Sequence, residues 1–383
     1  MTDHWCALPF SAVTYYADGS VAPCCKYLDR DTSRDFYQVD PKEALRSPMF
    51  QSLQRQFTNG EKPEACRKCW NAEDQGLPSF RTDMRDRWPW ARPADTPAGA
   101  VKMIDVAFGN VCNAACLTCD SVSSQKWNGE TSELLKIPGN PFERWLYPAQ
   151  SHAPEWSIEQ VRDIEFALFD QSEPFLQPGF KSLIRRLKDA GALARMSLFL
   201  STNGSYWPSE DVLADLLTAK KLEIQISVDG TDKMFEYLRY PLRWDVVDST
   251  VDRWVKWAGA HGNTRLIGRM TLSALNLLHE SKVDKWWHSK YSTPLTHGVV
   301  YNPWYLAPMV LSQDLRHSLA QTSVHLRVVK SMSLPDSWHP SYARHSERER
   351  IDVLRRFLFG REKARALSLQ SVCPQTYDMI FSE

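Results

Sequence analysis

The chain has 383 residues and equal numbers of acidic and basic side chains, 46 of each, so its formal net charge at pH 7 is zero. A neutral chain lacks the broad positive field that attracts a polyanion, which disfavours a tight nucleic-acid partner unless a local basic patch supplies one. No stretch approaches the roughly 18 consecutive apolar residues of a membrane span, and no apolar signal segment opens the sequence. We therefore expect a cytoplasmic protein with no membrane partner.

Cysteines crowd the first part of the chain. Residues 1–98 contain five of the nine cysteines in a stretch rich in turn-forming residues, and a Pro-rich segment at 88–99 then predicts a linker. Close pairs of cysteines in a long chain favour metal-binding thiolates in a reducing compartment over disulfides. The sequence therefore predicts a small cysteine-rich domain over residues 1–98.

Residues 99–311 show a different pattern, in which short apolar runs alternate with amphipathic segments such as 178–190 and 244–260. Such alternation is typical of βαβ units around a parallel sheet. Six strands are expected, at 101–108, 163–169, 195–201, 222–228, 265–272 and 297–302. The predicted fold class is α/β, as a partial (β/α)6 TIM-like barrel whose active site gathers at the carboxyl ends of the strands. Residues 312–383 are expected to form a C-terminal helical extension.

Three cysteines follow the first predicted strand of this barrel. They are spaced as Cys112-x3-Cys116-x2-Cys119, which lets three thiolates bind one iron–sulfur cluster. Three ligands on a four-iron cluster leave one iron open for a further molecule, whereas four thiolates are typical of electron transfer or structure. A structural zinc site is the alternative, but zinc usually takes a fourth Cys or His nearby, and His152 and Cys373 are distant in the sequence. The spacing therefore indicates cluster chemistry.

This spacing after a first strand resembles the motif of the radical S-adenosylmethionine (SAM) superfamily, and the resemblance covers about residues 100–305. It implies that Cys112, Cys116 and Cys119 hold a [4Fe–4S] cluster whose open iron chelates SAM. It also implies that one electron, delivered by a flavodoxin- or ferredoxin-type donor, cleaves SAM to a 5′-deoxyadenosyl radical that takes a hydrogen atom from the substrate. We therefore expect an enzyme, of the isomerase, oxidoreductase or transferase class.

Polar residues at successive strand ends resemble the SAM contacts of this superfamily. Asp170-Gln-Ser-Glu-Pro174 stands in the place of a Gly-Gly-Glu-Pro motif, so Glu173 would accept hydrogen bonds from the SAM amino group. The resemblance assigns further cofactor contacts to the next two strand ends and to a following arginine, namely Ser201, Asn203, Ser227, Asp229 and Arg239. The chain departs from the motifs at both glycines, which are Gln171 and Ser172 here, and at Thr118, where an aromatic residue is common.

The cysteines of residues 1–98 resemble a second cluster site. Cys6 and Cys24 belong to a Cys-x12-Gly-x4-Cys pattern, and Cys66-x2-Cys69 follows, as in the twitch and SPASM auxiliary-cluster modules. The resemblance implies a second [4Fe–4S] cluster on these four thiolates, with no open iron. The glycine spacing favours Cys24 over Cys25 as the ligand, and Cys25 is then a buried thiol or one that lies behind the ligands. There are too few cysteines for a full SPASM module, which favours the twitch type, although such modules usually follow the barrel and this segment precedes it. Zinc bound by the same four thiolates is the alternative.

Two substrate classes fit the resemblance. Twitch and SPASM relatives modify peptides or small molecules. Similar stand-alone twitch proteins of tailed phages include isomerases that act on modified thymine bases in DNA hypermodification, which would place this protein in the host cytoplasm. The 15 tryptophans could stack a flipped base, and the basic segment 344–365 could meet phosphates, although a solvent-exposed helix face is the plainer interpretation of that segment.

No catalytic acid or base is assigned, because hydrogen-atom abstraction by a cofactor radical needs none. The later strands offer polar side chains for a substrate pocket: Arg269, Thr271, Ser273, Asn276, Tyr301 and Asn302. A non-enzymatic iron–sulfur or zinc protein is the remaining alternative. It would explain the cysteines but not the ordered polar residues at successive strand ends.

Overall fold

The computed structural model describes residues 4–92, 95, 99–137, 141–142, 146–147, 151–152, 154–322 and 339–382. One eight-stranded sheet forms its centre, in the order β2-β1-β3-β4-β5-β6-β7-β8. Every neighbouring pair of strands is parallel except β1 with β2. The strands are β1 (Ala12–Tyr15), β2 (Val21–Ala22), β3 (Met103–Val106), β4 (Phe166–Phe169), β5 (Ser197–Thr202), β6 (Lys221–Ser227), β7 (Thr264–Leu272) and β8 (Leu295–Val299).

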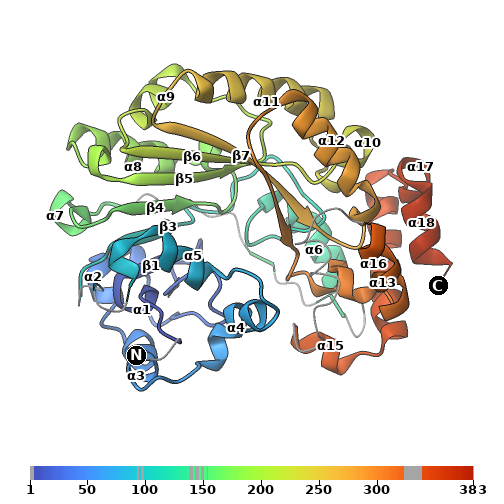
Figure 1. The fold of residues 1–383 in the computed structure, drawn as a ribbon, viewed down its shortest axis with the longest axis horizontal. Coiled ribbons are helices and arrows are strands. Elements are labelled where there is room, and N and C mark those ends of the chain that lie inside the picture. The colour runs from blue at the N-terminus through green and yellow to red at the C-terminus, as the bar shows by residue number, and fades with distance from the viewer. Residues whose placement is uncertain are drawn as a thin grey trace.

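From β3 to β8 the order in the sheet follows the order in the chain, so every connection moves on to the next neighbour. Connections of one hand then place the helices on one face and curl the sheet into an open barrel (Figure 1). The predicted α/β fold with a partial barrel is confirmed. All six predicted strands are present, each with bounds within three residues of those expected.

The N-terminal segment adds two strands that the sequence did not predict. β1 pairs in parallel with β3, with Val13 opposite Ile104, and β2 then pairs antiparallel with β1. All four residues of β1 are buried, because β3 and the surrounding helices cover them. A run of four residues is too short for its hydrophobic pattern to distinguish a strand from a turn. The predicted boundary near residue 98 therefore falls between two strands of one sheet. The division into domains at 98 and 311 stays a prediction.

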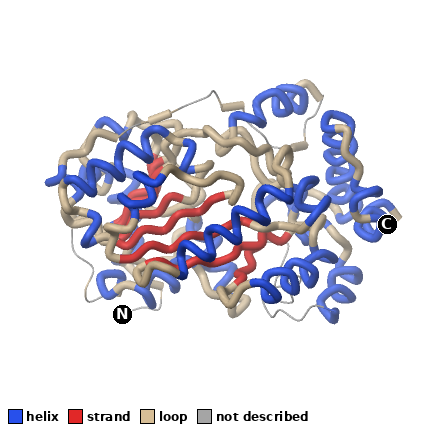
Figure 2. Tube along the Cα trace, turned by 90° about the horizontal axis from the view of Figure 1, so that it is seen from above, coloured by secondary structure: helices blue, strands red, loops and turns tan. Residues whose placement is uncertain are grey.

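The helices surround this sheet (Figures 1 and 2). The α-helices are α1 (Leu8–Ser11), α2 (Pro41–Ala44), α3 (Pro48–Thr58), α4 (Arg67–Asp74), α5 (Phe80–Arg87), α6 (Asn128–Leu135), α7 (Ile158–Val161), α8 (Pro178–Asp189), α9 (Glu210–Leu216), α10 (Asp232–Leu238), α11 (Trp244–Gly259), α12 (Glu280–Lys290), α13 (Gln313–Thr322), α15 (Pro340–Arg344), α16 (Glu347–Arg365), α17 (Leu369–Val372) and α18 (Pro374–Phe381). None of the helices in the described ranges is both long enough and apolar enough to cross a bilayer.

Helix α8 shows how the outer layer is attached. Phe180, Leu183, Ile184 and Leu187 are buried, and their i, i+3, i+4, i+7 spacing places them on one stripe of the helix. Burial of each such side chain contributes roughly 2 kcal/mol. The helix confirms the prediction at 178–190, and α11 confirms the one at 244–260.

The basic helix α16 has a solvated face, on which Arg348, Arg356 and Lys363 are exposed, but it also buries three arginines. Arg350, Arg361 and Arg365 are buried. Arg350 donates hydrogen bonds to backbone carbonyls, and the other two form ion pairs with Glu130 of α6. Part of the charge pattern of α16 therefore reflects internal contacts, and those of Arg361 and Arg365 attach the C-terminal helices to α6.

Candidate active site

The candidate site lies at the carboxyl ends of β3 to β6. The loop over residues 112–119, which carries the three barrel cysteines, leaves the sheet shortly after β3. Its backbone is tied to the end of α10 and to the segment that follows, because the N–H of Ala115 donates to the carbonyl of Tyr240 at 2.6 Å and that of Leu117 to the carbonyl of Leu238 at 2.8 Å. The loop is therefore held in shape by backbone hydrogen bonds that do not depend on a bound metal.

The C-terminal helix α16 braces the same loop. Arg365 donates through Nη2 to the carbonyl of Ala115 at 2.7 Å and through Nε to Glu130 at 3.0 Å. The indole N–H of Trp127 donates to the carbonyl of Cys116 at 3.0 Å. Segments far apart in the sequence thus converge on the cysteine loop, which sequence patterns alone do not reveal.

Burial controls the protonation of the three thiols. Cys112, Cys116 and Cys119 are half-buried, and burial is the first cause of the raised pKa of each thiol, to about 12 for Cys112. Such thiols stay protonated at neutral pH unless a metal displaces the protons. Among the described side chains, no three His, Cys, Asp or Glu meet closely enough to share a single metal ion.

The residues around the loop fit a cluster held by three thiolates. Arg239 Nη1 lies 3.9 Å from the sulfur of Cys116, and Asn203 Nδ2 lies 3.9 Å from the sulfur of Cys112. N–H groups directed at the sulfurs stabilise the negative charge of cluster thiolates and adjust the reduction potential of the cluster. Both donors come from the predicted SAM-contact set, so the structure brings these residues to the cysteine loop.

Glu173 is fully buried beside the end of β5. Its carboxylate accepts hydrogen bonds from Thr202 Oγ1 at 2.9 Å and from the backbone N–H of Asn203 at 2.9 Å. Burial nevertheless dominates and raises the pKa of Glu173 to about 7. A carboxylate held in this way can still accept a hydrogen bond from an ammonium group, and that charge would restore its ionised form.

Replacing Glu173 with glutamine is expected to change the pH dependence of stability. The pKa of Glu173 in the folded chain, about 7, lies above its ordinary value of 4.5, so the folded state binds this proton more tightly. The associated stability is present below pH 4.5 and is lost as pH rises through 7. Between pH 5 and pH 8, wild type should therefore lose about 2 to 3 kcal/mol of unfolding free energy relative to Glu173→Gln, at 1.36 kcal/mol per pKa unit. Urea unfolding of both proteins without iron, at the two pH values, measures the difference. Equal changes in the unfolding free energy of the two proteins between pH 5 and pH 8 would contradict this prediction.

Ser172 occupies the position of the second motif glycine and keeps the backbone conformation of a glycine. Its φ is +60°, in the left-handed region that costs a non-glycine residue about 1 kcal/mol. Its hydroxyl donates to the carbonyl of Gly109 at 2.6 Å, which holds the turn in place. The loss of the glycine therefore does not abolish the turn that precedes Glu173.

Three further predicted SAM contacts, Ser201, Asn203 and Ser227, differ in how many hydrogen bonds their side chains already form. Ser201 accepts a hydrogen bond from Gln225 Nε2 at 3.0 Å. Asn203 is buried, and its side chain donates to Asn113 Oδ1 at 2.8 Å. Ser227 is half-buried at the end of β6, and within the described residues its hydroxyl has no recorded hydrogen bond. Of the three, Ser227 has a hydroxyl left available for a ligand.

Asp229 and Arg239 form a buried ion pair. Arg239 Nη2 lies 2.8 Å from Asp229 Oδ2, and the two side chains are 9% and 3% exposed. Asp229 Oδ1 accepts the N–H of Thr271 at 2.7 Å, while Asn276 Nδ2 donates to the Asp229 carbonyl at 2.9 Å. The pair thus links the ends of β6 and β7 and directs Arg239 toward Cys116. The sequence predicted both residues as ligand contacts but not their pairing.

Four of the N-terminal cysteines are close neighbours. The charges of Cys6, Cys24 and Cys69 act on one another and on Cys66, and burial is the first cause of the raised pKa of each thiol, to about 12 for Cys6. Cys25 faces elsewhere, toward Lys26 and Asp170 in the barrel interior. Within the predicted twitch segment, Arg81 forms an ion pair with Glu73 and donates to the carbonyl of Trp5 at 2.8 Å.

Substitution of the adjacent cysteines Cys24 and Cys25 should separate a cluster ligand from a cavity thiol. Cys24→Ser is expected to lose the second cluster, so that iron per chain falls from about eight to about four after anaerobic reconstitution. Cys25→Ser, the matched control, should keep the full content, because this thiol faces away from the other four. Iron analysis with absorbance near 400 nm measures both. Loss of iron in Cys25→Ser but not in Cys24→Ser would reverse the assignment.

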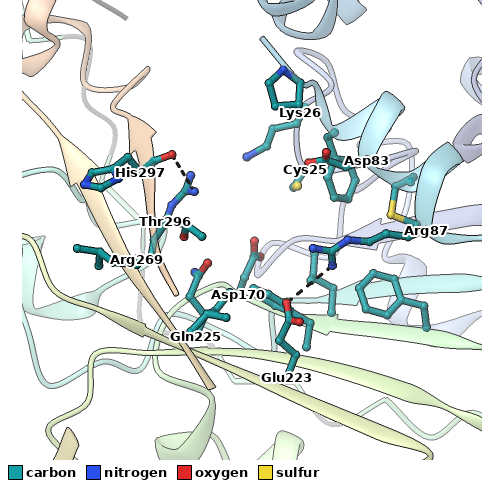
Figure 3. A pocket seen from close by; sticks show the side chains of 18 residues that line it. Cys25, Lys26, Asp83, Arg87, Asp170, Glu223, Gln225, Arg269, Thr296 and His297 are labelled. Carbon is teal, nitrogen blue, oxygen red and sulfur yellow. Dashed lines mark hydrogen bonds and ion pairs between the residues drawn. The ribbon is translucent and has the colours of Figure 1, made fainter. Parts of the chain in front are cut away.

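A cavity of 630 Å³ opens between the inner face of the sheet and the N-terminal segment (Figure 3). Its apolar wall comes from strands β4, β5, β7 and β8, at Phe166, Leu168, Phe199, Ile267 and Leu295. Its charged groups are Lys26, Asp83, Arg87, Asp170, Glu223 and Arg269, and Cys25, Gln225, Thr296 and His297 complete the polar part. The cavity is large enough for a small-molecule substrate.

Of the polar residues proposed for the later strands, Arg269 lines this cavity. Ser273 and Asn276 are buried and bonded to each other, since the Ser273 N–H donates to Asn276 Oδ1 at 2.7 Å, so they hold the loop after β7. Sequence reasoning missed Lys26, Glu223 and other cavity residues. Charged residues at inward positions of otherwise apolar strands were the available signal, because alternate residues of a strand share a face.

No protein-family model and no curated sequence matches the chain. Solved structures of partly similar fold include anSMEcpe with bound AdoMet, at 16% identity and a TM-score of 0.39, over 57% of this chain and 58% of that one. The Streptococcus suis protein SuiB bound to S-adenosylmethionine has 11% identity and a TM-score of 0.37, over 67% of this chain and 53% of that one. SuiB bound to the precursor peptide SuiA has 11% identity and a TM-score of 0.37, over 76% and 63%. The chain thus spans little more than half the length of the first of these structures, and likeness at this level describes part of the fold only.

Proposed function

We propose that the chain is a radical SAM enzyme that generates a 5′-deoxyadenosyl radical and uses it to take a hydrogen atom from a small molecule or peptide. One observation carries the proposal. The three-cysteine loop after β3 lies beside Arg239 and Asn203, each with an N–H group 3.9 Å from a cysteine sulfur. A structural metal site does not require a buried arginine, or polar residues from strand ends, beside its cysteines.

In this proposal Cys112, Cys116 and Cys119 hold a [4Fe–4S] cluster that, when reduced, supplies the electron for cleavage of bound SAM. Glu173 would accept a hydrogen bond from the SAM ammonium, and Arg239 would offer its guanidinium to the SAM carboxylate. Ser201, Asn203 and Ser227 would contact the remainder of the cofactor at the ends of β5 and β6. Asp229 holds Arg239 in place, so its role is to position that side chain.

The N-terminal cysteines Cys6, Cys24, Cys66 and Cys69 would hold the second [4Fe–4S] cluster. Four thiolates leave no open iron, so this cluster would pass electrons from a flavodoxin- or ferredoxin-type donor or shape the cavity wall. The position of Cys25 supports the second role, because it places a residue adjacent to a cluster ligand in the cavity itself.

The nucleobase alternative stays a prediction. It depended on tryptophans for stacking and on basic residues of α16 for phosphates. Trp127, Trp254, Trp287 and Trp304 are fully buried, and Arg361 and Arg365 of α16 pair with Glu130, so these side chains do not reach a nucleic acid. We propose a small molecule or peptide substrate on this ground.

The experiment that tests the proposed function is direct. Protein reconstituted anaerobically with iron and sulfide, then given dithionite and SAM, is expected to release 5′-deoxyadenosine, measured by liquid chromatography with mass spectrometry. Omission of dithionite is the control. Protein with its full iron content that releases none would rule out radical SAM chemistry.

A further inference from the structure

Two groups of opposite charge line the barrel cavity and attract each other without forming an ion pair. Asp170 follows β4 directly, and Lys26 reaches the same cavity from the loop after β2 (Figure 3). No hydrogen bond or ion pair joins the two side chains to each other or to other described residues. An unpaired charge in a partly enclosed site must be compensated by water or by a ligand. Opposite charges that face one cavity without meeting therefore leave room for a molecule between them.

The other charges of the cavity, which are Asp83, Arg87, Glu223 and Arg269, each have an interaction within the described residues. Arg87 lies 3.7 Å from Glu223, which also pairs with Arg265 at 3.3 Å. Arg269 donates through Nη1 to the carbonyl of His297 at 3.2 Å. Its guanidinium lies over Gly298, where an added Cβ would come within 1.9 Å of Nη2. Lys26 and Asp170 are therefore the charges left for a ligand.

Asp105 lies behind Asp170 and affects its charge. Asp105 is fully buried, and it accepts a hydrogen bond from Thr14 Oγ1 at 3.2 Å. Burial, together with the charge of Asp170, raises the pKa of Asp105 well above its ordinary value, so Asp105 keeps its proton. Burial also raises the pKa of Asp170, but the positive charges of Lys26 and Arg269 oppose that rise. Asp170 is the carboxyl group that faces the cavity, where the positive charges of Lys26 and Arg269 favour its ionised form.

We propose that this cavity binds a free α-amino acid, with its ammonium group at Asp170 and its carboxylate at Lys26. A ligand with one charge would leave one of these side chains unpaired. A residue inside a peptide chain does not qualify, because both of its charged groups are then amides. The side chain of the amino acid would lie against the apolar wall of Leu168, Phe199 and Ile267. The inference rests on the proposed function only in treating this molecule as the substrate.

The cavity connects with the proposed SAM site through two structural links. Asp170 lies three residues before Glu173 on the same loop. Gln225 lines the cavity and donates to Ser201, a proposed SAM contact, at 3.0 Å. An amino acid held by Asp170 and Lys26 would therefore lie next to the strand ends at which the radical is generated.

Binding is tested first on the unaltered, anaerobically reconstituted protein. Each proteinogenic L-amino acid is added up to about 10 mM, and binding is followed by saturation-transfer NMR and calorimetry, methods that detect millimolar Kd values. At least one amino acid is expected to bind. Its methyl ester, which lacks the carboxylate, and its N-acetyl form, which lacks the ammonium, should each bind roughly tenfold or more weakly, because each loses a charge-assisted hydrogen bond.

Variants then assign each end of the ligand. Asp170→Asn and Lys26→Gln should each weaken binding by roughly tenfold. In Asp170→Asn the N-acetyl form should bind as well as the free amino acid, and in Lys26→Gln the methyl ester should do so. Arg265→Gln removes a charge that pairs with Glu223 but does not line this cavity, so it serves as the matched control and should leave the Kd within about twofold.

Several results would overturn the inference. The first is that no amino acid binds. The second is that the methyl ester or the N-acetyl form binds to wild type as well as the free amino acid does. The third is that the N-acetyl form still binds more weakly than the free amino acid to Asp170→Asn, or the methyl ester to Lys26→Gln. Competition between SAM and the amino acid would place these charges in the cofactor site instead. The tests with the methyl ester and the N-acetyl form use the wild-type protein, so they still test the inference if a variant fails to fold. Protein that releases 5′-deoxyadenosine but binds no amino acid would overturn this inference alone and leave the proposed function standing.

Discussion

Replacing Cys116 with alanine is expected to abolish the release of 5′-deoxyadenosine from SAM. In the proposed site this thiol is one of three ligands of the cluster, and Arg239 Nη1 lies 3.9 Å from its sulfur. A cluster with two protein ligands is lost or rearranged, so iron should fall from about eight to about four atoms per chain. The fold should persist, because the loop is held by backbone hydrogen bonds such as that from Ala115 to the Tyr240 carbonyl.

The matched control for this prediction is Cys373→Ala. Cys373 is a half-buried free cysteine between α17 and α18, with its sulfur 3.1 Å from Thr376 Oγ1, and it belongs to neither cysteine group. Its variant should keep full iron content and full release. Iron analysis and product quantification on both variants measure the difference. Release by Cys116→Ala near the wild-type rate would show that this cysteine does not hold the reactive cluster.

The strands and the cysteine motifs could be predicted because both depend on residues that are close together in the sequence. Apolar runs such as 222–228 and 265–272 are flanked by clear helical segments, so their period reveals them. The spacing of the barrel cysteines is likewise a local signal. β1 was missed because four residues give no usable period, and its place in the sheet depends on β3, about 90 residues later in the chain.

Contacts between distant segments account for the rest of what the sequence did not reveal. Arg365 reads as a surface charge in a basic helix, yet it is buried because Glu130, far earlier in the chain, faces it. Cys24 and Cys25 are neighbours in sequence but face different surroundings, which depends on the turn between them and the barrel. The charge of Lys26 enters the cavity only because the N-terminal segment folds under the sheet. Which charged side chains pair, and which way each side chain points, depend on contacts that form only in the folded chain.

Replacing Arg239 with methionine is expected to cost about 3 to 5 kcal/mol of unfolding free energy, because it leaves Asp229 buried without its partner. The Asp229 side chain is 3% exposed and would keep only the N–H of Thr271 as a donor. The same change removes the guanidinium proposed for the SAM carboxylate, so SAM affinity should fall by roughly tenfold or more. Urea unfolding and calorimetric titration with SAM measure the two effects.

Two further variants separate the buried pair from a general effect of losing an arginine. Arg243→Met removes an arginine whose ion pair with Asp245 is exposed, at 71% and 64%, so stability and SAM affinity should both stay close to wild type. Adding Asp229→Asn to Arg239→Met removes the unpaired charge and should recover at least half of the lost stability, but none of the lost SAM affinity. This split is decisive, since a purely structural role for Arg239 would let stability and affinity recover together. Equal losses in Arg239→Met and Arg243→Met would show that the buried pair contributes nothing beyond a surface charge.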